Sequence, residues 1–378
     1  MERFLPIFLI GFAVLVFLQC SSPFEPEVKE FADTENEILR EVNANQIPSL
    51  AAWVVKDDSL VWQKYYGYAE VASRRAADRN TIYGLASISK LVIVTATMQL
   101  REQGLLNLDA DINAYLPFAV RNPNYPEQKI TPYHLLTHTS GLAWPENEFE
   151  VPEYYTHYPL DSAPPLREWL PEFILPEGAH YVSTVWKNSR PGEREGYSNI
   201  GTALLAYLVE VVSKTDYNEY CKQHIFAPLE MFNASYVYAD LDRSNLATLY
   251  DYPNHPIGFY RYRDYPAGDL KSTIANFSHL VMAYMHGGQY KNARILQEST
   301  VQDILKMRNP ASGICLLWDY TVGDWYGHAG GKPGVAAYVE FQRDSKVALM
   351  IASNYRHGSV YPGNKIHALV RRIAKRYE

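Results

Sequence analysis

The chain has 378 residues, 47% of them hydrophobic, which is enough apolar material for one large domain or two coupled ones. Its net charge is −7 and its charges are interspersed, so it lacks the basic stripe of a nucleic-acid-binding protein and we expect no nucleic-acid partner. Three cysteines make no disulfide framework. We expect Cys221 and Cys315 to be core thiols, and in the absence of a CxxC or Cys/His cluster we expect no metal and no cofactor.

The first element along the chain is an apolar run from Phe4 to Leu18, which is followed by Gln19 and Cys20. It is shorter than the ~20 residues that span a bilayer and fits the core of an export signal. The arrangement resembles a bacterial lipoprotein signal, which implies a signal peptide at 1–19 and lipidation of Cys20. Since Gln19 stands where a small residue is usual, an uncleaved anchor or ordinary cleavage nearby remains open. We expect an exported protein of the bacterial cell envelope, lipid-anchored on the periplasmic side or the outer membrane.

A tether at 20–33 and a helix at Thr34–Asn43 are predicted next. Two apolar runs follow, Ser49–Asp57 and Ser59–Glu70. They are separated by a pair of aspartates, so they predict a β-hairpin. A helix that begins near Ser87 and ends before a glycine is apolar nearly all round, which predicts that it is buried.

The middle of the chain, about 105–310, is predicted to be a mainly helical insertion with Pro- and Tyr-rich loops. Its clearest helices are predicted at Asn199–Val212, Tyr217–Ile225, Thr273–His286 and Glu298–Met307. Strands are then predicted at 313–320, 334–344 and 346–354, and a last helix at Lys365–Arg376. Strands at both ends with helices between them predict an α+β protein, in which a mixed antiparallel sheet flanked by helices is built from both chain ends.

Ser87 and Lys90 form an S-x-x-K pattern at the start of the buried helix. A serine hydroxyl is a weak nucleophile and needs a nearby base. Residues three apart face the same side of a helix, burial lowers the pKa of a lysine, and the helix N-terminus favours developing negative charge. Taken alone, the pattern would be better explained by a helix-capping serine and a surface lysine.

Two further patterns contain groups that serve such a serine. Tyr197 and Asn199 are expected in an extended loop, where alternate side chains point the same way; Tyr197 could relay protons and Asn199 could hold a substrate amide. His328, Gly330 and Gly331 are expected to precede a strand. The glycines would let a substrate lie close to the backbone, and the Gly331 N–H could be a hydrogen-bond donor.

Three motifs therefore occur in this order: Ser87-x-x-Lys90, Tyr197-x-Asn199 and His328-x-Gly330. They resemble the motifs of the penicillin-recognising serine hydrolases, nearest to the class C β-lactamases, D-Ala-D-Ala carboxypeptidases, D-aminopeptidases and β-lactamase-like esterases. Flanking segments such as Thr131–Leu142 also resemble the family, and the resemblance covers about residues 34–375. It implies a β-lactamase/transpeptidase-like fold for a hydrolase domain at 34–378, with the site in a cleft between the sheet and the helical part.

The resemblance also implies the catalytic roles. Ser87 would be the acylated nucleophile. Lys90 would share its proton network, and Tyr197 would be the general base or acid. The order of the proton transfers between Lys90 and Tyr197 is left open by the sequence.

The same resemblance implies that four further residues bind substrate. Asn199 would orient it, and His328 would replace the lysine of the K-T-G form, with Gly330 beside it. The N–H groups of Ser87 and Gly331 would form the oxyanion hole. A neutral imidazole at His328 would hold a carboxylate less well than an ammonium, which argues against an efficient β-lactamase.

These residues predict a serine hydrolase that works through an acyl-enzyme, as a peptidase or amidase on D-amino-acid-containing peptides at the cell envelope. A β-lactamase-like esterase or weak β-lactamase is the first alternative. A penicillin-binding or sensing module that does not turn over is the second. The expected partners are a small-molecule or peptide substrate and, through Cys20, the membrane.

Two other features have competing interpretations. His134 and His138 have a zinc-binding spacing, but Leu135 stands where H-E-x-x-H has its glutamate, so a structural role is expected. Asp269 is expected to be a solvated loop residue; selection of a substrate amine is the alternative.

Overall fold

A computed structural model describes residues 31–143, 156–321 and 323–378. The expected signal peptide at 1–19, the lipidation of Cys20 and nearly all of the tether at 20–33 lie outside the described residues. Within the described part of the chain, the helices are too short or too polar for any of them to cross a membrane.

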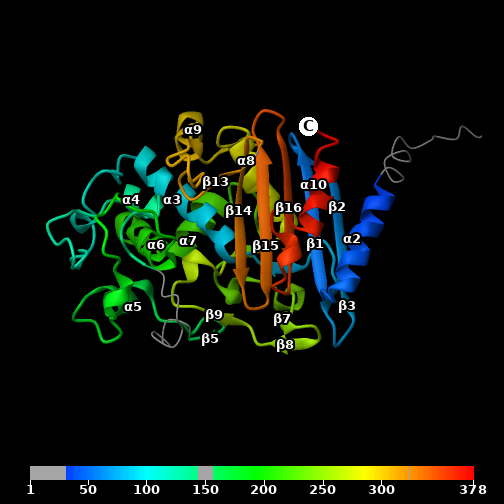
Figure 1. Ribbon diagram of the computed structural model, residues 1–378, viewed down its shortest axis with the longest axis horizontal. Coiled ribbons are helices and arrows are strands. Elements are labelled where there is room, and N and C mark those ends of the chain that lie inside the picture. Colours follow the sequence, from blue (N-terminus) through cyan, green and yellow to red (C-terminus); the bar gives the residue numbers. More distant parts are fainter. Residues whose placement is uncertain (1–30, 144–155, 322) are drawn as a thin grey trace, which may run out of the picture.

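A seven-stranded sheet dominates one side of the molecule (Figure 1), with the strand order β13-β14-β15-β16-β1-β2-β3. The strands are β1 (Ser49–Lys56), β2 (Ser59–Glu70), β3 (Arg75–Ala76), β13 (Asp319–Thr321), β14 (Trp325–Lys332), β15 (Val335–Gln342) and β16 (Val347–Ser353). Every neighbouring pair is antiparallel. Because β1 pairs with both β2 and β16, the two ends of the chain share one sheet, and the predicted fold class is confirmed.

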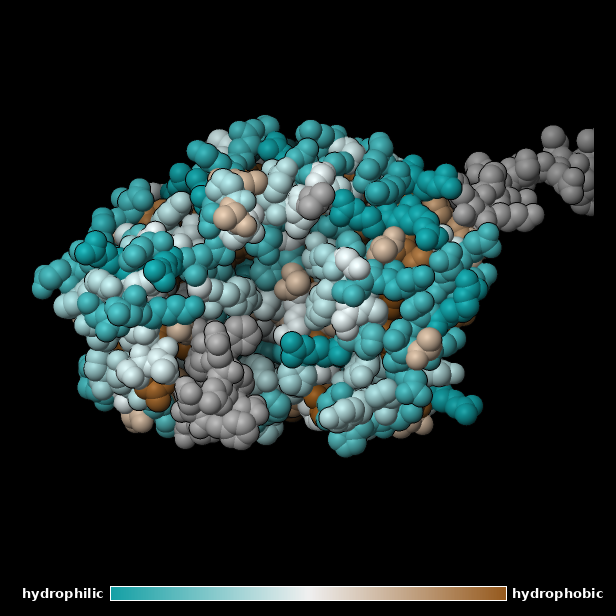
Figure 2. Space-filling view, viewed as in Figure 1, coloured by the Kyte–Doolittle hydropathy of each residue, from teal (hydrophilic) through white to brown (hydrophobic). Residues whose placement is uncertain are grey.

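Helices cover both faces of this sheet. Helices α2 (Ala32–Ala44) and α10 (Lys365–Ala374) pack together on one face, and α8 (Ile274–Met285) packs against β1, β15 and β16 on the other. This explains why β16 is apolar along its whole length, since side chains on both of its faces are buried. The molecular face shown in Figure 2 is mostly hydrophilic, with apolar residues scattered over it.

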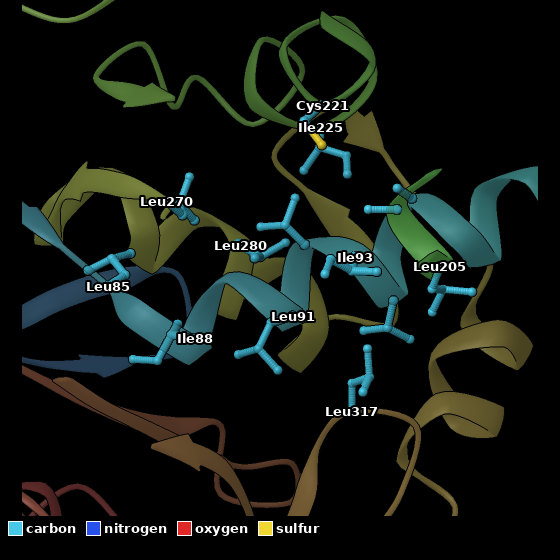
Figure 3. Packing of buried hydrophobic residues seen from close by; sticks show 14 of the residues in the cluster. Leu85, Ile88, Leu91, Ile93, Leu205, Cys221, Ile225, Leu270, Leu280 and Leu317 are labelled. Atoms are coloured by element: carbon cyan, nitrogen blue, oxygen red, sulfur yellow. The ribbon is translucent and has the colours of Figure 1, made fainter. Parts of the chain in front are cut away.

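Helix α3 (Lys90–Glu102) is the centre of the helical part and is buried on every side from Lys90 to Leu100, as predicted. Figure 3 shows apolar side chains from several elements gathered around it, among them Leu205, Leu280 and Leu317. Helices α6 (Asn199–Ser213), α7 (Tyr217–Cys221) and α9 (Glu298–Leu305) pack against α3, and α4 (Pro132–Leu136) and α5 (Leu166–Ile174) pack against α6. Cys221 and Cys315 are free, buried thiols, as expected.

Short strands connect these helices. One three-stranded sheet contains β4 (Ile82–Gly84), β10 (Lys271–Thr273) and β6 (Ala234–Ser235). Three two-stranded ribbons are formed by β5 (Tyr158–Pro159) with β9 (Tyr260–Arg261), β7 (Leu249–Tyr252) with β8 (His255–Ile257), and β11 (Gln289–Tyr290) with β12 (Ala293–Arg294).

One prediction about the C-terminal strands was wrong. The run 313–320 is not one strand, because only its end enters β13; Leu316 N–H donates to Ile304 O, and Leu317, at φ 56°, donates to Leu136 O. Its apolar residues pack into the helical core, which a short apolar run does not distinguish from a buried strand. His328 precedes the strand predicted at 334–344, which is β15, but it also lies inside β14, a strand that the sequence did not predict.

The expectation for Asp269 was wrong as well. This side chain is 1% exposed; it forms an ion pair with Lys332 at the end of β14 and accepts a hydrogen bond from the Tyr262 N–H at 3.0 Å. It is therefore neither solvated nor free to select a substrate amine. The pair ties the segment before β10 to the large sheet.

Breaking this buried pair should be costly. Asp269→Ala or Lys332→Ala is expected to lower the free energy of unfolding by about 3–5 kcal/mol, since each leaves one charge buried without its partner. The double variant should lose less than the sum of the two. Urea denaturation measures all three, with Lys64→Ala as the control because it breaks an exposed ion pair with Glu35, worth less than about 1 kcal/mol. An Asp269→Ala cost as small as that of the control would contradict the prediction.

Candidate active site

Ser87 lies in a tight turn at the entrance to α3. The turn is a 3₁₀ helix, Ala86–Ser89, that continues directly into α3, so the serine stands at the positive end of the helix. Ala86 has φ 46°, a strained value for a residue other than glycine. The Ser89 hydroxyl holds this shape, because it donates to Ala86 O at 2.5 Å and accepts from the Leu270 N–H at 3.0 Å.

Lys90 is completely buried beneath the serine. Its Nζ lies 3.2 Å from Ser87 Oγ, 2.7 Å from Asn199 Oδ1 and 2.8 Å from the carbonyl oxygen of Ala267. Burial lowers the pKa of Lys90 to about 7, although the Asp264 carboxylate opposes that change. The amine is therefore part neutral and part charged near neutral pH.

These contacts fix the direction in which the lone pair of the neutral amine points. The Ala267 carbonyl and the Asn199 side-chain oxygen are acceptors only, so each takes one N–H of the amine. A neutral amine has two N–H groups, and its lone pair is then left facing Ser87 Oγ. Lys90 is thus arranged to take the serine proton.

Tyr197 is the third member of the cluster. It shares a hydrogen bond with Ser87, and Lys90 Nζ lies 4.8 Å from the centre of its ring. Burial raises the pKa of Tyr197 above its ordinary value, and the hydrogen bond with Ser87 offsets this only in part. The phenol keeps its proton at neutral pH, which suits a group that passes protons on.

His138 also belongs to the site, which its sequence pattern did not indicate. Its ring lies 4.7 Å from that of Tyr197, its Nδ1 accepts the Ser198 N–H at 3.2 Å, and it lines the cleft. Burial first and the Lys90 charge second lower its pKa to about 3, so it is neutral. His134, its expected companion, instead closes the N-terminal cap of α4, where its Nδ1 accepts from the Thr131 N–H at 3.3 Å. The spacing of the two histidines in the sequence does not indicate that they have different roles.

Asn199 is the first residue of α6, and Ser198 caps that helix by accepting from the Gly201 N–H. Its side-chain oxygen contacts Lys90, so the described structure shows it orienting the amine. The predicted contact with a substrate amide stays a prediction.

Strand β14 forms one wall of the site. The Nδ1–H of His328 donates to the Ala329 carbonyl at 2.7 Å, while burial and the Lys90 charge lower the pKa of His328 to about 3. His328 is therefore neutral at neutral pH. Gly330 packs against the serine turn: a Cβ there would lie 2.3 Å from Leu85 O and 3.1 Å from Ser87 N.

Together these elements enclose an open cleft of about 410 Å³. It is lined by Ser87, His138, Glu195, Tyr197, Ile314, Leu317, Asp319, His328, Ala329, Gly330, Gly331, Arg356 and Tyr361. Most of the residues predicted to bind substrate or to react are part of this lining. The two exceptions, Asn199 and Lys90, lie behind it. No sequence pattern indicated four of these lining residues, which are Glu195, Asp319, Arg356 and Tyr361. Burial in the cleft, with a smaller effect of Glu195, raises the pKa of Asp319 to about 6.

One edge of β14 faces the cleft without a strand beside it. Among the described strands, β13 pairs only with Trp325–Gly327, whereas β15 follows β14 from Trp325 to Lys332. The segment His328–Gly331 therefore has strand neighbours on one side only and lines the cleft. Such an edge can accept an extended peptide through main-chain hydrogen bonds.

A model of the beta-lactamase family matches residues 33–371. The chain belongs to the beta-lactamase family. Beta-lactamase-like protein 2 of Dictyostelium discoideum is 27% identical over 326 residues, which are 80% of this chain and 56% of that protein. The chain spans about half the length, or less, of the curated relatives that it matches. The resemblance inferred from the three motifs is confirmed.

Several solved structures share the fold. The octameric penicillin-binding protein homologue from Pyrococcus abyssi has a TM-score of 0.74 at 21% identity, over 92% of this chain and 77% of that one. The D-amino acid amidase from Ochrobactrum anthropi SV3 has a TM-score of 0.71 at 21% identity, over 91% and 98%. The predicted β-lactamase/transpeptidase-like fold is thereby confirmed.

The close approach of Gly330 to the serine turn gives a first test of the site. Gly330→Ala is expected to lower kcat/KM by about 100-fold or more, because its Cβ would push Leu85 and Ser87 out of place. Gly258→Ala is the matched control, since a Cβ there would meet nothing within 4 Å. Steady-state kinetics on any turned-over ester or peptide compares the two. Equal activities would contradict the packing described here.

The pKa of Lys90 gives a second test. The neutral fraction of an amine with a pKa of about 7 rises about tenfold between pH 6 and pH 8, and the rate of Ser87 acylation should rise with it. Asp264 raises this pKa, so Asp264→Asn should move the rise to lower pH. Stopped-flow measurement of acylation gives both profiles. His138 and His328, with pKa values of about 3, would not produce such a rise, and a flat profile or a shift to higher pH would refute the assignment.

Proposed function

We propose that this protein is a serine hydrolase that forms an acyl-enzyme on Ser87. The observation that carries the proposal is the contact of Ser87 Oγ with both Lys90 Nζ, at 3.2 Å, and Tyr197, at the bottom of an open cleft. A chance S-x-x-K pattern on a helix surface would have neither the buried amine nor the tyrosine.

The contacts support a specific course of acylation. Ser87 Oγ attacks the substrate carbonyl carbon while its proton passes to the neutral Lys90 amine. The tetrahedral intermediate then collapses, the bond to the leaving group breaks, and the proton reaches the leaving nitrogen or oxygen through Tyr197. Water later attacks the acyl carbon by the same route in reverse, which releases the acid and restores Ser87. The N–H groups of Ser87 and Gly331 are proposed to hold the oxyanion.

Within this class we propose a peptidase or amidase on D-amino-acid-containing peptides. The unpaired edge of β14 suits an extended main chain, and a D-amino acid amidase is among the proteins of the same fold. The neutral state of His328 argues against an efficient β-lactamase, because a neutral imidazole holds a carboxylate less well than an ammonium. The export signal expected at 1–19 would bring the protein to such peptides at the cell envelope.

Two alternatives use the same serine. A β-lactamase-like esterase or weak β-lactamase would acylate from small esters or lactams, which need little contact with the β14 edge. A penicillin-binding or sensing module would acylate and stop. Rapid turnover of short-chain esters with D-Ala-terminated peptides left intact would favour the first, and a stable adduct without turnover the second.

The nucleophile is tested by intact-protein mass spectrometry of residues 21–378 with a fluorophosphonate. Wild type should gain one adduct and Ser87→Ala none, because the reagent needs the activated hydroxyl. Ser244→Ala, which removes an exposed serine, should label like wild type. Undiminished labelling of Ser87→Ala would end the proposal, whatever the natural substrate is.

A further inference from the structure

The loop that carries Tyr197 is held by one residue of another segment. Residues 194–198 form neither helix nor strand, so their backbone donors need other partners. The Gly196 N–H donates to the carbonyl oxygen of His138 at 2.8 Å, and the Ser198 N–H donates to Nδ1 of the same residue at 3.2 Å. His138 therefore accepts the backbone donors on both sides of Tyr197, which fixes the path of the loop there.

The backbone conformation of His138 lets it reach both donors. It lies just after α4, and its φ of 54° is in the left-handed region that residues other than glycine seldom adopt. This turn leaves both the carbonyl and the ring of His138 facing residues 196–198. Such conformations persist only where the surroundings hold them, and they are common at functional sites.

The hydrogen bond with Ser198 also fixes the protonation of the ring. A backbone N–H can only donate, so Nδ1 carries a lone pair and the proton of the neutral ring is on Nε2. Burial lowers the pKa of His138 to about 3, with smaller effects from the charges of Lys90 and His328. The ring therefore stays neutral whether or not Lys90 is charged, and the acceptor is retained throughout a reaction cycle.

The ring of His138 also limits how Tyr197 can turn. The two ring centres lie 4.7 Å apart at an angle of 41°, and Lys90 Nζ lies 4.8 Å from the centre of the tyrosine ring. The Tyr197 hydroxyl shares a hydrogen bond with Ser87. Its position matters for any proton transfer, because a displacement of about 1 Å can slow a reaction about a hundredfold.

We propose that His138 is a positioning residue for the proton transfer from Tyr197 to the leaving group, and that this role depends on its Nδ1. The inference rests on the proposed function. When the bond to a leaving nitrogen breaks, Tyr197 gives that nitrogen a proton and regains one from Lys90, which took it from Ser87. His138 itself exchanges no proton; it holds Ser198, and hence Tyr197, in place. A leaving group that departs without a proton should therefore be nearly indifferent to His138.

The test compares two leaving groups on one acyl group, in the p-nitrophenyl ester and the p-nitroanilide of acetyl-D-alanine. The phenolate leaves as an anion, whereas the anilide nitrogen must be protonated as its bond breaks. His138→Phe keeps a ring beside Tyr197, and His138→Gly fits the positive φ, but both lack the acceptor. Each should lose about ten- to a hundredfold in kcat/KM on the anilide and less than about threefold on the ester.

Two further variants make the comparison specific. The Oδ1 of asparagine lies as many bonds from the backbone as Nδ1 of histidine, and asparagine tolerates a positive φ. His138→Asn should therefore recover most of the anilide activity, although it lacks the ring. His255→Phe replaces an exposed histidine of β8 and should match wild type on both substrates.

Fluorophosphonate labelling separates this inference from the function on which it depends, because fluoride also leaves without a proton. Labelling retained in the His138 variants, with a loss confined to the anilide in His138→Gly or His138→Phe and recovery in His138→Asn, supports the proposal. Equal losses on both substrates in a variant that still labels, no loss in His138→Gly, or an asparagine variant as impaired as the glycine variant would overturn it and leave Ser87 as the nucleophile. Wild type that does not label would instead end the proposed function.

If wild type labels but cleaves neither substrate, the p-nitrophenyl and phenyl esters of one phosphonate are compared as labels of Ser87. Phenolate is the poorer leaving group of the two and gains more from a proton. A larger loss of labelling rate with the phenyl ester in His138→Gly, recovered in His138→Asn, then supports the inference. Equal or absent losses overturn it.

Discussion

The burial of the Lys90 amine is the constraint on which the site depends. An ammonium without water must find three acceptors, and here it has the Ser87 hydroxyl, the Asn199 side chain and the Ala267 carbonyl. These three acceptors come from the turn before α3, the start of α6 and the segment before β10. One buried amine thus fixes the relative positions of three segments that are far apart in the sequence. It also acquires the pKa of about 7 that lets it act as a base.

The remaining architecture holds the partners of that amine in place. Ser89 fixes the strained turn, Ser198 caps α6 so that Asn199 and Tyr197 approach from the same side, and His138 packs against Tyr197. The large sheet contributes the opposite wall through β14. That wall approaches the serine closely only because Gly330 has no side chain. Each support is a short-range packing or hydrogen-bonding requirement, so small changes there act directly on the geometry of Ser87.

The sequence was sufficient for the features that depend on local spacing. The hairpin of β1 and β2 followed from two apolar runs and a polar turn, and the contact of Ser87 with Lys90 followed from helical periodicity. These predictions succeeded because the residues involved are neighbours in the chain, or because three motifs in a fixed order identify a family.

The failures concern contacts between distant segments. The prediction of a strand at 313–320 failed because nothing local shows that this apolar run packs against α9 and α4. The prediction that Asp269 is a solvated loop residue failed because its partner, Lys332, lies on β14, far along the chain. His138 and Arg356 reach the cleft only through long-range packing, so no spacing pattern could indicate them.

The groups around Ser87 carry little charge, whereas the fixed charges of the cleft lie farther from it. Near neutral pH, His138 and His328 are neutral, Tyr197 is protonated and Lys90 is only partly charged. The centre that attacks the carbonyl therefore exerts a weak field on a substrate. The fixed charges stand at the periphery of the cleft, on side chains that do not touch the serine. The described lining of the cleft is therefore weakly charged around Ser87 and more strongly charged at its periphery.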